Sequence, residues 1–358
     1  MESPLRVGIM STAFIGKKTI QAIGKAAGAE VVGVASRSLE KAEAFAKEQG
    51  VSKAYGTYEE MLADANVQAV YIPLPTALRA EWVIKAAKAG KHILCEKPAA
   101  TSLAELKEMI KACEDNQVLW MDGVMFMHHD RVQRVQEQVA KVGPATFVNS
   151  GFSFSGSDDF LSNDIRMSPD LEPFSALGDL GWYNIRATMM AYGWDIPARV
   201  SVHSHRNVDG KNLPSEVTAT MVYGDERRAT FHSSFHHAFR QTLDISGPNG
   251  QIVLDDFVLE RTPEEVQFSV ITDSGPNSDH QTVSDTTTIV TVKGCCQEQC
   301  MWERFARLVA KGKEASDAST NPLETWQFWK DVSLKTQAVL DACAASAKQD
   351  GAFVAVAL

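Results

Sequence analysis

The sequence has few cysteines, no long apolar run and no charged segment leading into an apolar one at its N-terminus. The six cysteines among 358 residues follow neither a CxxC spacing nor a disulfide framework, so we expect reduced thiols. No run approaches the ~20 apolar residues that span a bilayer, and no signal peptide is predicted. These absences predict a cytoplasmic protein.

Basic clusters are also absent. The net charge is −10 and no run of Lys or Arg occurs, so we expect neither nucleic acid nor a membrane as a partner. The length predicts two domains rather than one. With 44% hydrophobic and 22% charged residues, the composition is that of a globular protein with a large core.

Strand-like and helix-like segments alternate in residues 1–124. Five short apolar runs, beginning with LRVGIM (5–10) and AEVVGVAS (29–36), are separated by helical patterns such as SLEKAEAFAKEQ (38–49). This alternation predicts βαβ units and a parallel sheet. The runs lack period-2 alternation, as expected when helices cover both sheet faces. We predict an α/β protein with an N-terminal Rossmann domain, a doubly wound parallel sheet, over residues 1–124.

The pattern changes after about residue 125. Residues 198–294 contain strand-like runs separated by turn signals such as GDE and GPNG. Two helical patterns, 299–312 and 324–349, follow them. We therefore predict a C-terminal α+β domain, residues 125–358, with a large open and mostly antiparallel sheet for substrate binding and oligomerisation. Its last helices are expected to pack back on the Rossmann domain.

The turn after the first strand, STAFIG (11–16), lies where dinucleotide-binding folds hold a pyrophosphate. Ser11, Ala13 and Gly16 occupy the three glycine positions of the G-x-G-x-x-G spacing. Because these residues are small, the backbone can still approach a phosphate, and the Ser11 and Thr12 hydroxyls can donate to it. The turn predicts a nucleotide cofactor.

The second strand ends in Ser36, Arg37 and Ser38. Folds that bind NAD place an Asp or Glu there to hold the ribose hydroxyls. An arginine instead pairs with a 2′-phosphate and stacks on the adenine. We therefore expect NADP(H) to be favoured over NAD(H). The alternative is that Arg37 is only a solvated surface charge.

Two further segments carry titratable side chains beside predicted strands and helices. Glu96, Lys97 and Pro98 directly follow an apolar strand, and ligands of open α/β sheets bind beyond the carboxyl ends of the strands. Lys97 can hold positive charge near a developing oxyanion, and Glu96 can orient Lys97 or the backbone. In GDLGWY, Asp179 and Tyr183 are i and i+4 and share one face of a helix start. A nearby ammonium lowers a tyrosine pKa and favours its phenolate.

Together these segments resemble the Gfo/Idh/MocA (glucose–fructose oxidoreductase/inositol dehydrogenase) family. The resemblance rests on the degenerate glycine turn, on VYIPLPTALRAEWVIKAAKAGKHILCEKP (70–98) and on GDLGWY (178–183), and extends from about Arg6 to about Ala347. The subgroup resembles dimeric dihydrodiol dehydrogenase and NADP-linked D-xylose dehydrogenase.

The resemblance implies an NADP(H)-preferring dehydrogenase or reductase acting on CH–OH groups. Hydride would pass between the nicotinamide and a sugar, polyol or cyclic diol, with Lys97, Tyr183 and Asp179 as catalytic residues. It also implies a homodimer formed through the C-terminal sheet, and a Pro98 that is cis. The alternative is a nucleotide-binding regulatory or scaffold protein of the same fold without turnover.

The binding residues are expected at matching positions. Those for the cofactor are Ser11, Thr12, Ala13, Phe14, Ile15, Ser36, Arg37, Leu74, Pro75, Thr76, Leu78, Glu96 and Lys97. Those for the substrate are Asp122, His129, Phe154, Asn163, Arg166 and Trp182. Asp122 stands where many relatives carry Glu, and Asp130 follows His129 where relatives often have Pro, so the substrate itself stays open.

Five histidines are candidate metal ligands. The histidines His203, His205, His232, His236 and His237 lie in strand-like runs, where i and i+2 share a face. No acidic or cysteine ligand lies at a supporting spacing in the sequence, and the family needs no metal. The sequence therefore predicts no metal site.

Overall fold

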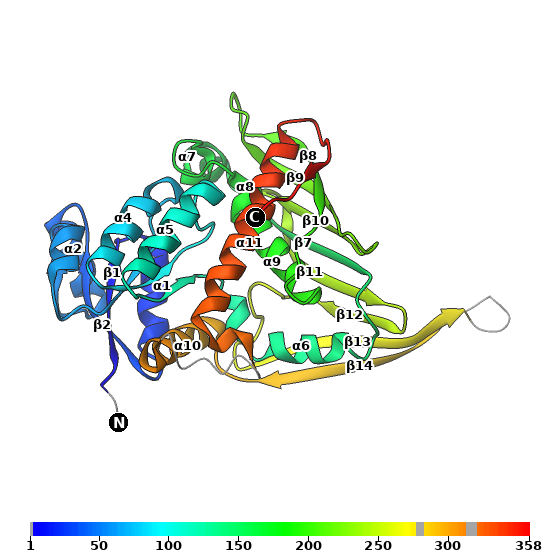
Figure 1. Cartoon of the computed structure of the whole chain (residues 1–358), viewed down its shortest axis with the longest axis horizontal. Helices are drawn as coiled ribbons and strands as arrows, with labels where there is room; N and C mark the ends of the chain where they lie inside the picture. Colours follow the sequence, from blue (N-terminus) through cyan, green and yellow to red (C-terminus); the bar gives the residue numbers. More distant parts are fainter. Residues whose placement is uncertain (1–2, 277–282, 313–320) are drawn as a thin grey trace. The chain divides into compact units, whose positions relative to one another are not determined.

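The computed structural model describes residues 3–276, 283–312 and 321–358 and divides into two compact units (Figure 1). The first unit contains Met1–His128 and Glu298–Gln337, and the second contains His129–Gln297 and Ala338–Leu358. The first unit thus ends four residues later than the sequence predicts, and it also includes a C-terminal segment. None of the helices in the described part of the chain is long and apolar enough to cross a membrane.

A six-stranded parallel sheet forms the centre of the first unit, in the order β3-β2-β1-β4-β5-β6. This is the doubly wound arrangement that the sequence predicts. Because all strands are parallel, their carboxyl ends lie along one edge, and the strand order reverses between β1 and β4. The strands are β1 (Leu5–Met10), β2 (Ala29–Ala35), β3 (Ala54–Tyr55), β4 (Ala69–Ile72), β5 (His92–Cys95) and β6 (Trp120–Asp122).

Helices connect these strands, and their ends follow local capping chemistry. The Ser102 hydroxyl accepts a hydrogen bond from the Glu105 N–H at 3.2 Å, as a capping box predicts. The Glu105 carboxylate, however, accepts from the Thr101 N–H at 2.7 Å, one residue before the position the box expects. The helices are α1 (Phe14–Ile23), α2 (Leu39–Gln49), α3 (Tyr58–Ala63), α4 (Thr76–Lys88) and α5 (Leu103–Asp115).

The C-terminal segment completes the core of the first unit. The Trp302 ring packs edge-on against Tyr71 of β4 at a centroid distance of 5.9 Å. The Trp120 indole N–H of β6 donates to Ser333 at 3.2 Å. These contacts bury both tryptophans. The segment's elements are α10 (Gln297–Lys311), η3 (Pro322–Glu324) and the first part of α11 (Trp326–Ala347), and η1 (Met125–His128) precedes the unit boundary.

The second unit is built on a nine-stranded sheet, in the order β14-β13-β12-β11-β7-β10-β9-β8-β15. All of its pairs are antiparallel except β7–β10, which is parallel. The strands are β7 (Phe147–Ser155), β8 (Arg199–Asn207), β9 (Pro214–Val222), β10 (Arg228–Ser234), β11 (His236–Gly247), β12 (Gly250–Leu254), β13 (Glu265–Pro276), β14 (Val283–Lys293) and β15 (Val354–Ala355).

Two helices cover one face of this sheet, as Figure 1 shows for α8 and α9 beside β7, β9 and β10. The Asn184 amide of α9 donates to Ser233 of β10 at 3.1 Å. We call the opposite side of the sheet the outer face; in β9 it carries Glu216, Thr218 and Thr220, which alternate with fully or almost fully buried apolar residues. The helices of this unit are α6 (Arg131–Val139), α7 (Asp158–Asn163), η2 (Ile165–Met167), α8 (Ser175–Asp179) and α9 (Gly181–Ala191).

The cysteines differ in part from expectation. Cys95, Cys113, Cys296 and Cys343 are free thiols, whereas Cys295 and Cys300 are disulfide-bonded. The expectation of six reduced thiols is therefore wrong for two of them. Their spacing matches no common framework, but Cys300 lies in the first turn of α10 and Cys295 lies two residues before that helix.

Candidate functional site

The turn between β1 and α1 leaves a helix N-terminus open at the carboxyl edge of the sheet. The Ala13 N–H donates to the Ser11 hydroxyl at 3.0 Å, which holds the turn. Ala13 is the N-cap of α1 and has no side-chain acceptor, and the first turn contains no acidic residue. The first N–H groups of the helix are therefore available to an anion, as the sequence predicts for a pyrophosphate.

A pocket opens at the carboxyl ends of β1 and β2. It is lined by Ser11, Thr12, Ser36, Arg37, Ser38, Lys41 and Tyr58. Two of these residues are cations and none is an acid, so the pocket is complementary to a phosphate. Burial raises the Tyr58 pKa, and the positive charge of the exposed Arg37 opposes this rise.

Lys41 and Tyr58 were missed by the sequence reasoning. Lys41 lies in the first turn of α2, where its N–H donates to the N-cap Ser38 at 3.4 Å. The N-cap signal, Ser38 directly before a helical pattern, was available in the sequence and places Lys41 in the first turn. Tyr58 begins α3, and only the fold brings it beside the end of β2.

Apolar side chains are exposed at the starts of the neighbouring helices. Phe14 is 82% exposed, and Ile15 and Leu78 are 37% and 39% exposed. Exposed apolar side chains gathered at such an edge are typical of a ligand-binding groove. Leu74 and Thr76, by contrast, are buried.

The segment after β5 is held in place by the side chains around it. Tyr71 donates its hydroxyl to Glu96 Oε1 at 2.5 Å, and the Lys97 N–H donates to Glu96 Oε2 at 3.2 Å. Burial and the adjacent Glu96 charge raise the Tyr71 pKa well above its usual value, so Tyr71 remains a donor. Glu96 thus orients the backbone of Lys97, one of its two expected roles.

The Lys97–Pro98 peptide bond is cis, as the resemblance implied. The buried Arg79 donates to the carbonyl of Pro98 and, at 2.7 Å, to that of Leu74. It therefore ties the loop after β4 to the loop after β5. On the adjacent strand, Asp122 is fully buried and pairs in register with Cys95.

In the second unit, Asp179 and Tyr183 lie on either side of a helix junction. Asp179 ends α8 and Tyr183 is in the first turn of α9, with Leu180 between the two helices. This corrects the single helix start that the sequence suggested. Arg166 Nε donates to Asp179 Oδ2 at 2.8 Å and its NH1 group to Asp164 at 3.1 Å. The Asp179 charge raises the pKa of Arg166, so the guanidinium remains charged.

Tyr183 is 6% exposed and packs edge-on against Phe152, with ring centroids 5.7 Å apart. Its neighbour Trp182 is fully buried, with the Arg186 guanidinium 5.9 Å from its ring centroid. The structure thus places Trp182 in the core. Phe154 packs against Phe160 and Phe235 at 5.2 and 5.1 Å.

Two other predicted substrate residues make contacts of their own within the second unit. Asn163 is exposed and donates to Asp159, four residues earlier in α7, at 2.8 Å. His129 is buried, its Nδ1 accepts from the Arg131 N–H at 2.9 Å, and its Nε2 lies 3.9 Å from Glu260 Oε1. Burial lowers the His129 pKa. Among the substrate residues predicted in this unit, Arg166 donates a hydrogen bond to the predicted catalytic residue Asp179.

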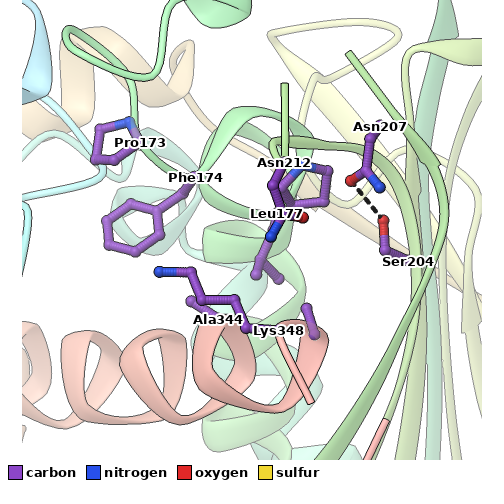
Figure 2. A pocket seen from close by; sticks show the side chains of 10 residues that line it. Pro173, Phe174, Leu177, Ser204, Asn207, Asn212, Ala344 and Lys348 are labelled. Atoms are coloured by element: carbon purple, nitrogen blue, oxygen red, sulfur yellow. Dashed lines mark hydrogen bonds between the residues drawn. The ribbon is translucent and has the colours of Figure 1, made fainter. Parts of the chain in front are cut away.

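A small recess also lies beside α8. Figure 2 shows Phe174 and Leu177 of this region facing Lys348 at the end of α11. On its other side the Ser204 hydroxyl donates to the Asn207 amide oxygen at 3.0 Å. None of the predicted site residues lines this recess, although Leu177 precedes Asp179 by two positions.

Comparisons with known proteins find matches in both units of the chain. Two family models match the chain: an oxidoreductase family with an NAD-binding Rossmann fold over residues 5–123, and a GFO/IDH/MocA C-terminal domain over residues 132–253. Together they include the glycine turn, the segment after β5 and the Asp179–Tyr183 junction.

Individual relatives act on sugars and diols. A D-xylose 1-dehydrogenase (NADP(+)) from Haloferax volcanii is 36% identical over 246 residues, which is 68% of this chain and 74% of the relative. A trans-1,2-dihydrobenzene-1,2-diol dehydrogenase from Sus scrofa is 28% identical over 70% of this chain and 74% of its own. The crystal structure of the 3-ketoreductase KijD10 from Actinomadura kijaniata, with NADP and TDP-benzene, has a TM-score of 0.80 at 24% identity, covering 96% and 98% of the two chains. That last likeness shows the fold.

Proposed function

The chain belongs to the Gfo/Idh/MocA family of oxidoreductases, and we propose that it transfers hydride between NADP(H) and a hydroxyl-bearing carbon of a sugar, polyol or cyclic diol. It is an enzyme of the NADP-linked dehydrogenase and reductase type. The observation that carries the proposal is the edge of the first unit, where an open helix N-terminus and a cationic pocket lie together. Because NADP(H) is an intracellular cofactor, we also propose a cytoplasmic location.

The residues at this edge suit the cofactor. The N-terminus of α1 would hold the pyrophosphate, and Arg37 and Lys41 would pair with the 2′-phosphate. When bound, the nicotinamide supplies or accepts the hydride. Lys97 follows β5 at the same carboxyl edge, and its backbone N–H donates to Glu96.

Proton transfer is assigned to residues of this chain. In the oxidative direction Tyr183, as phenolate, takes the proton of the substrate hydroxyl while the carbon loses hydride, and a carbonyl forms. Lys97 would hold positive charge near the developing oxyanion, and a nearby ammonium of this kind favours a phenolate. Asp179 orients the substrate, and its ion pair with Arg166 holds its carboxylate in position.

The competing proposal is a nucleotide-binding regulatory or scaffold protein of the same fold. Fold alone does not separate the two, but Lys97, Asp179 and Tyr183 are all present, and they favour the enzyme.

A substrate screen tests the proposed function. Purified protein is mixed with NADP+ or NAD+ and with aldoses, inositols or trans-diols, and cofactor reduction is followed by absorbance. Turnover with at least one class is expected. Tight NADP(H) binding without turnover in either direction would instead support the regulatory alternative.

Cofactor preference gives a sharper prediction. Replacing Arg37 with Ala is expected to weaken NADP(H) binding by about ten- to hundredfold, because a charged hydrogen bond to the 2′-phosphate is lost. NAD(H) affinity should change little, so the preference narrows. Fluorescence titration with both cofactors measures this. The control is Lys111→Ala, since Lys111 is an exposed lysine of α5 paired with Asp115. Equal affinities of the wild type for the two cofactors would contradict the assignment.

The outer face of the second sheet supports a proposed homodimer. The described helices α8 and α9 pack on the other face, and from the family resemblance we expect subunit contacts on an open sheet. Light scattering at micromolar concentration is expected to give twice the 39.1-kDa chain mass. Thr230→Arg, on the central strand β10, should give monomers, whereas Thr287→Arg on the edge strand β14 should not. A monomeric wild type would rule this assembly out.

A further inference from the structure

Three side chains with metal-binding atoms converge on the outer face of the second unit. Glu216 comes from β9, His232 from β10 and His237 from the start of β11. Glu216 Oε1 lies 2.8 Å from His237 Nε2 and 3.3 Å from His232 Nε2. One ligand atom of each residue lies within 4.8 Å of the others. We call this set the Glu216 cluster.

Strand pairing explains how these residues meet. In the β9–β10 register Glu216 is opposite Ser234, and His232 is opposite Thr218, so Glu216 and His232 are diagonal neighbours on one face. The register of β11 on β7 shifts between His236 and Arg240, and His237 lies in this irregular start. In the sequence Glu216 is 16 residues before His232 and 21 residues before His237. Only the strand pairing brings this acidic ligand to the histidines, so the sequence spacing did not reveal it.

Burial and a contact with Arg206 position the Glu216 carboxylate. The Glu216 side chain is 10% exposed, whereas those of His232 and His237 are 25% and 51% exposed. Arg206 Nε lies 3.3 Å from Glu216 Oε2. This contact occupies one carboxylate oxygen and leaves the other facing the two imidazoles. Ligating carboxylates in metal sites are oriented by just such outer partners.

We propose that Glu216, His232 and His237 bind one divalent transition-metal ion of the Zn²⁺ class, with water as the fourth ligand. Two imidazoles and a carboxylate are a donor set that zinc accepts, at distances of roughly 2 Å. Tetrahedral ligands at that distance are roughly 3.3 Å apart, so small side-chain movements adapt the observed spacing. Mg²⁺ and Ca²⁺ prefer all-oxygen ligands and do not fit.

The ion would connect three strands. Glu216, His232 and His237 belong to β9, β10 and β11, so a bound ion cross-links their ends and stabilises the second unit by mass action. The half-exposed His237 leaves access for the ion and for its water. This site uses none of the residues assigned to hydride transfer, so it does not depend on the proposed function.

Untagged protein, freed of metal by a chelator, is titrated with Co²⁺ and then with Zn²⁺. Co²⁺ is expected to give a saturable visible spectrum of tetrahedral type at one ion per chain, which Zn²⁺ removes. Zn²⁺ should also raise the melting temperature. His237→Ala and Glu216→Gln are expected to weaken binding at least about tenfold, since each removes one of three ligands. Circular dichroism checks that both variants are folded, and His237 is exposed enough for its loss to be tolerated.

His205→Ala is the matched control. His205 lies on β8 and its Nε2 is 2.8 Å from the Thr218 hydroxyl, outside the Glu216 cluster. Equal losses in His205→Ala and His237→Ala would show unspecific binding by surface histidines and overturn the proposal. No saturable spectrum would mean that the cluster is only a hydrogen-bond network that satisfies Glu216. One ion per two chains would place the ion between copies, which also contradicts a site within one chain.

Discussion

Replacing Tyr183 with phenylalanine is expected to lower kcat by ~10²–10⁴-fold, the usual contribution of a positioned acid–base group. The phenol proton is lost while the ring and its packing against Phe152 are retained, so cofactor binding should persist. Steady-state kinetics and NADPH fluorescence measure the two effects. The control is Tyr223→Phe. Tyr223 is a buried tyrosine of the same unit whose hydroxyl has no hydrogen-bond partner among the described residues.

Lys97→Ala should lose about as much, because Lys97 and Tyr183 are proposed to act on one hydroxyl. If they act as a unit, the double variant will be little worse than the poorer single variant. A Tyr183→Phe enzyme with nearly full activity would remove the tyrosine from the mechanism. Proton transfer would then pass to Asp122 or His129.

Replacing Asp256 with alanine is expected to destabilise the second unit by ~3–5 kcal/mol, because it leaves a buried arginine without its counter-ion. Arg131 NH1 lies 2.6 Å from Asp256 Oδ1, and their side chains are 3% and 7% exposed. Arg131 NH2 also donates to the Asp256 and Phe257 carbonyls at 3.0 and 3.2 Å. Burial lowers the Arg131 pKa and the Asp256 charge opposes this, so the pair depends on both partners.

Denaturant unfolding followed by circular dichroism measures this loss. Glu137→Ala is the control, on α6, the helix that also carries Arg131. Glu137 makes an exposed ion pair with Arg134, and such pairs contribute little to the free energy of unfolding. Exchanging Arg131 and Asp256 together for methionine and leucine should recover part of the stability. Similar stabilities of Asp256→Ala and Glu137→Ala would show that the pair is not needed.

Local patterns in the sequence were sufficient for the first unit. Apolar runs without alternation, separated by helical periods, specify a parallel sheet covered on both faces, and the structure has that sheet. Since parallel strands end at one edge, the positions of Ser11, Arg37 and Lys97 also followed from the sequence. The single helix start predicted around Asp179 was wrong in detail. Gly178 and Gly181 flank the break at Leu180, but glycines alone do not fix where one helix ends and the next begins.

Tertiary structure alone decided the pairings between distant residues. Arg166 meets Asp179, Arg131 meets Asp256 and Glu216 meets His232 across gaps of 13, 125 and 16 residues. Periodicity tells which face of a strand or helix a side chain lies on, and that much the sequence determined. Which strand lies opposite, and in which register, depends on the packing of the whole unit, and so do these contacts.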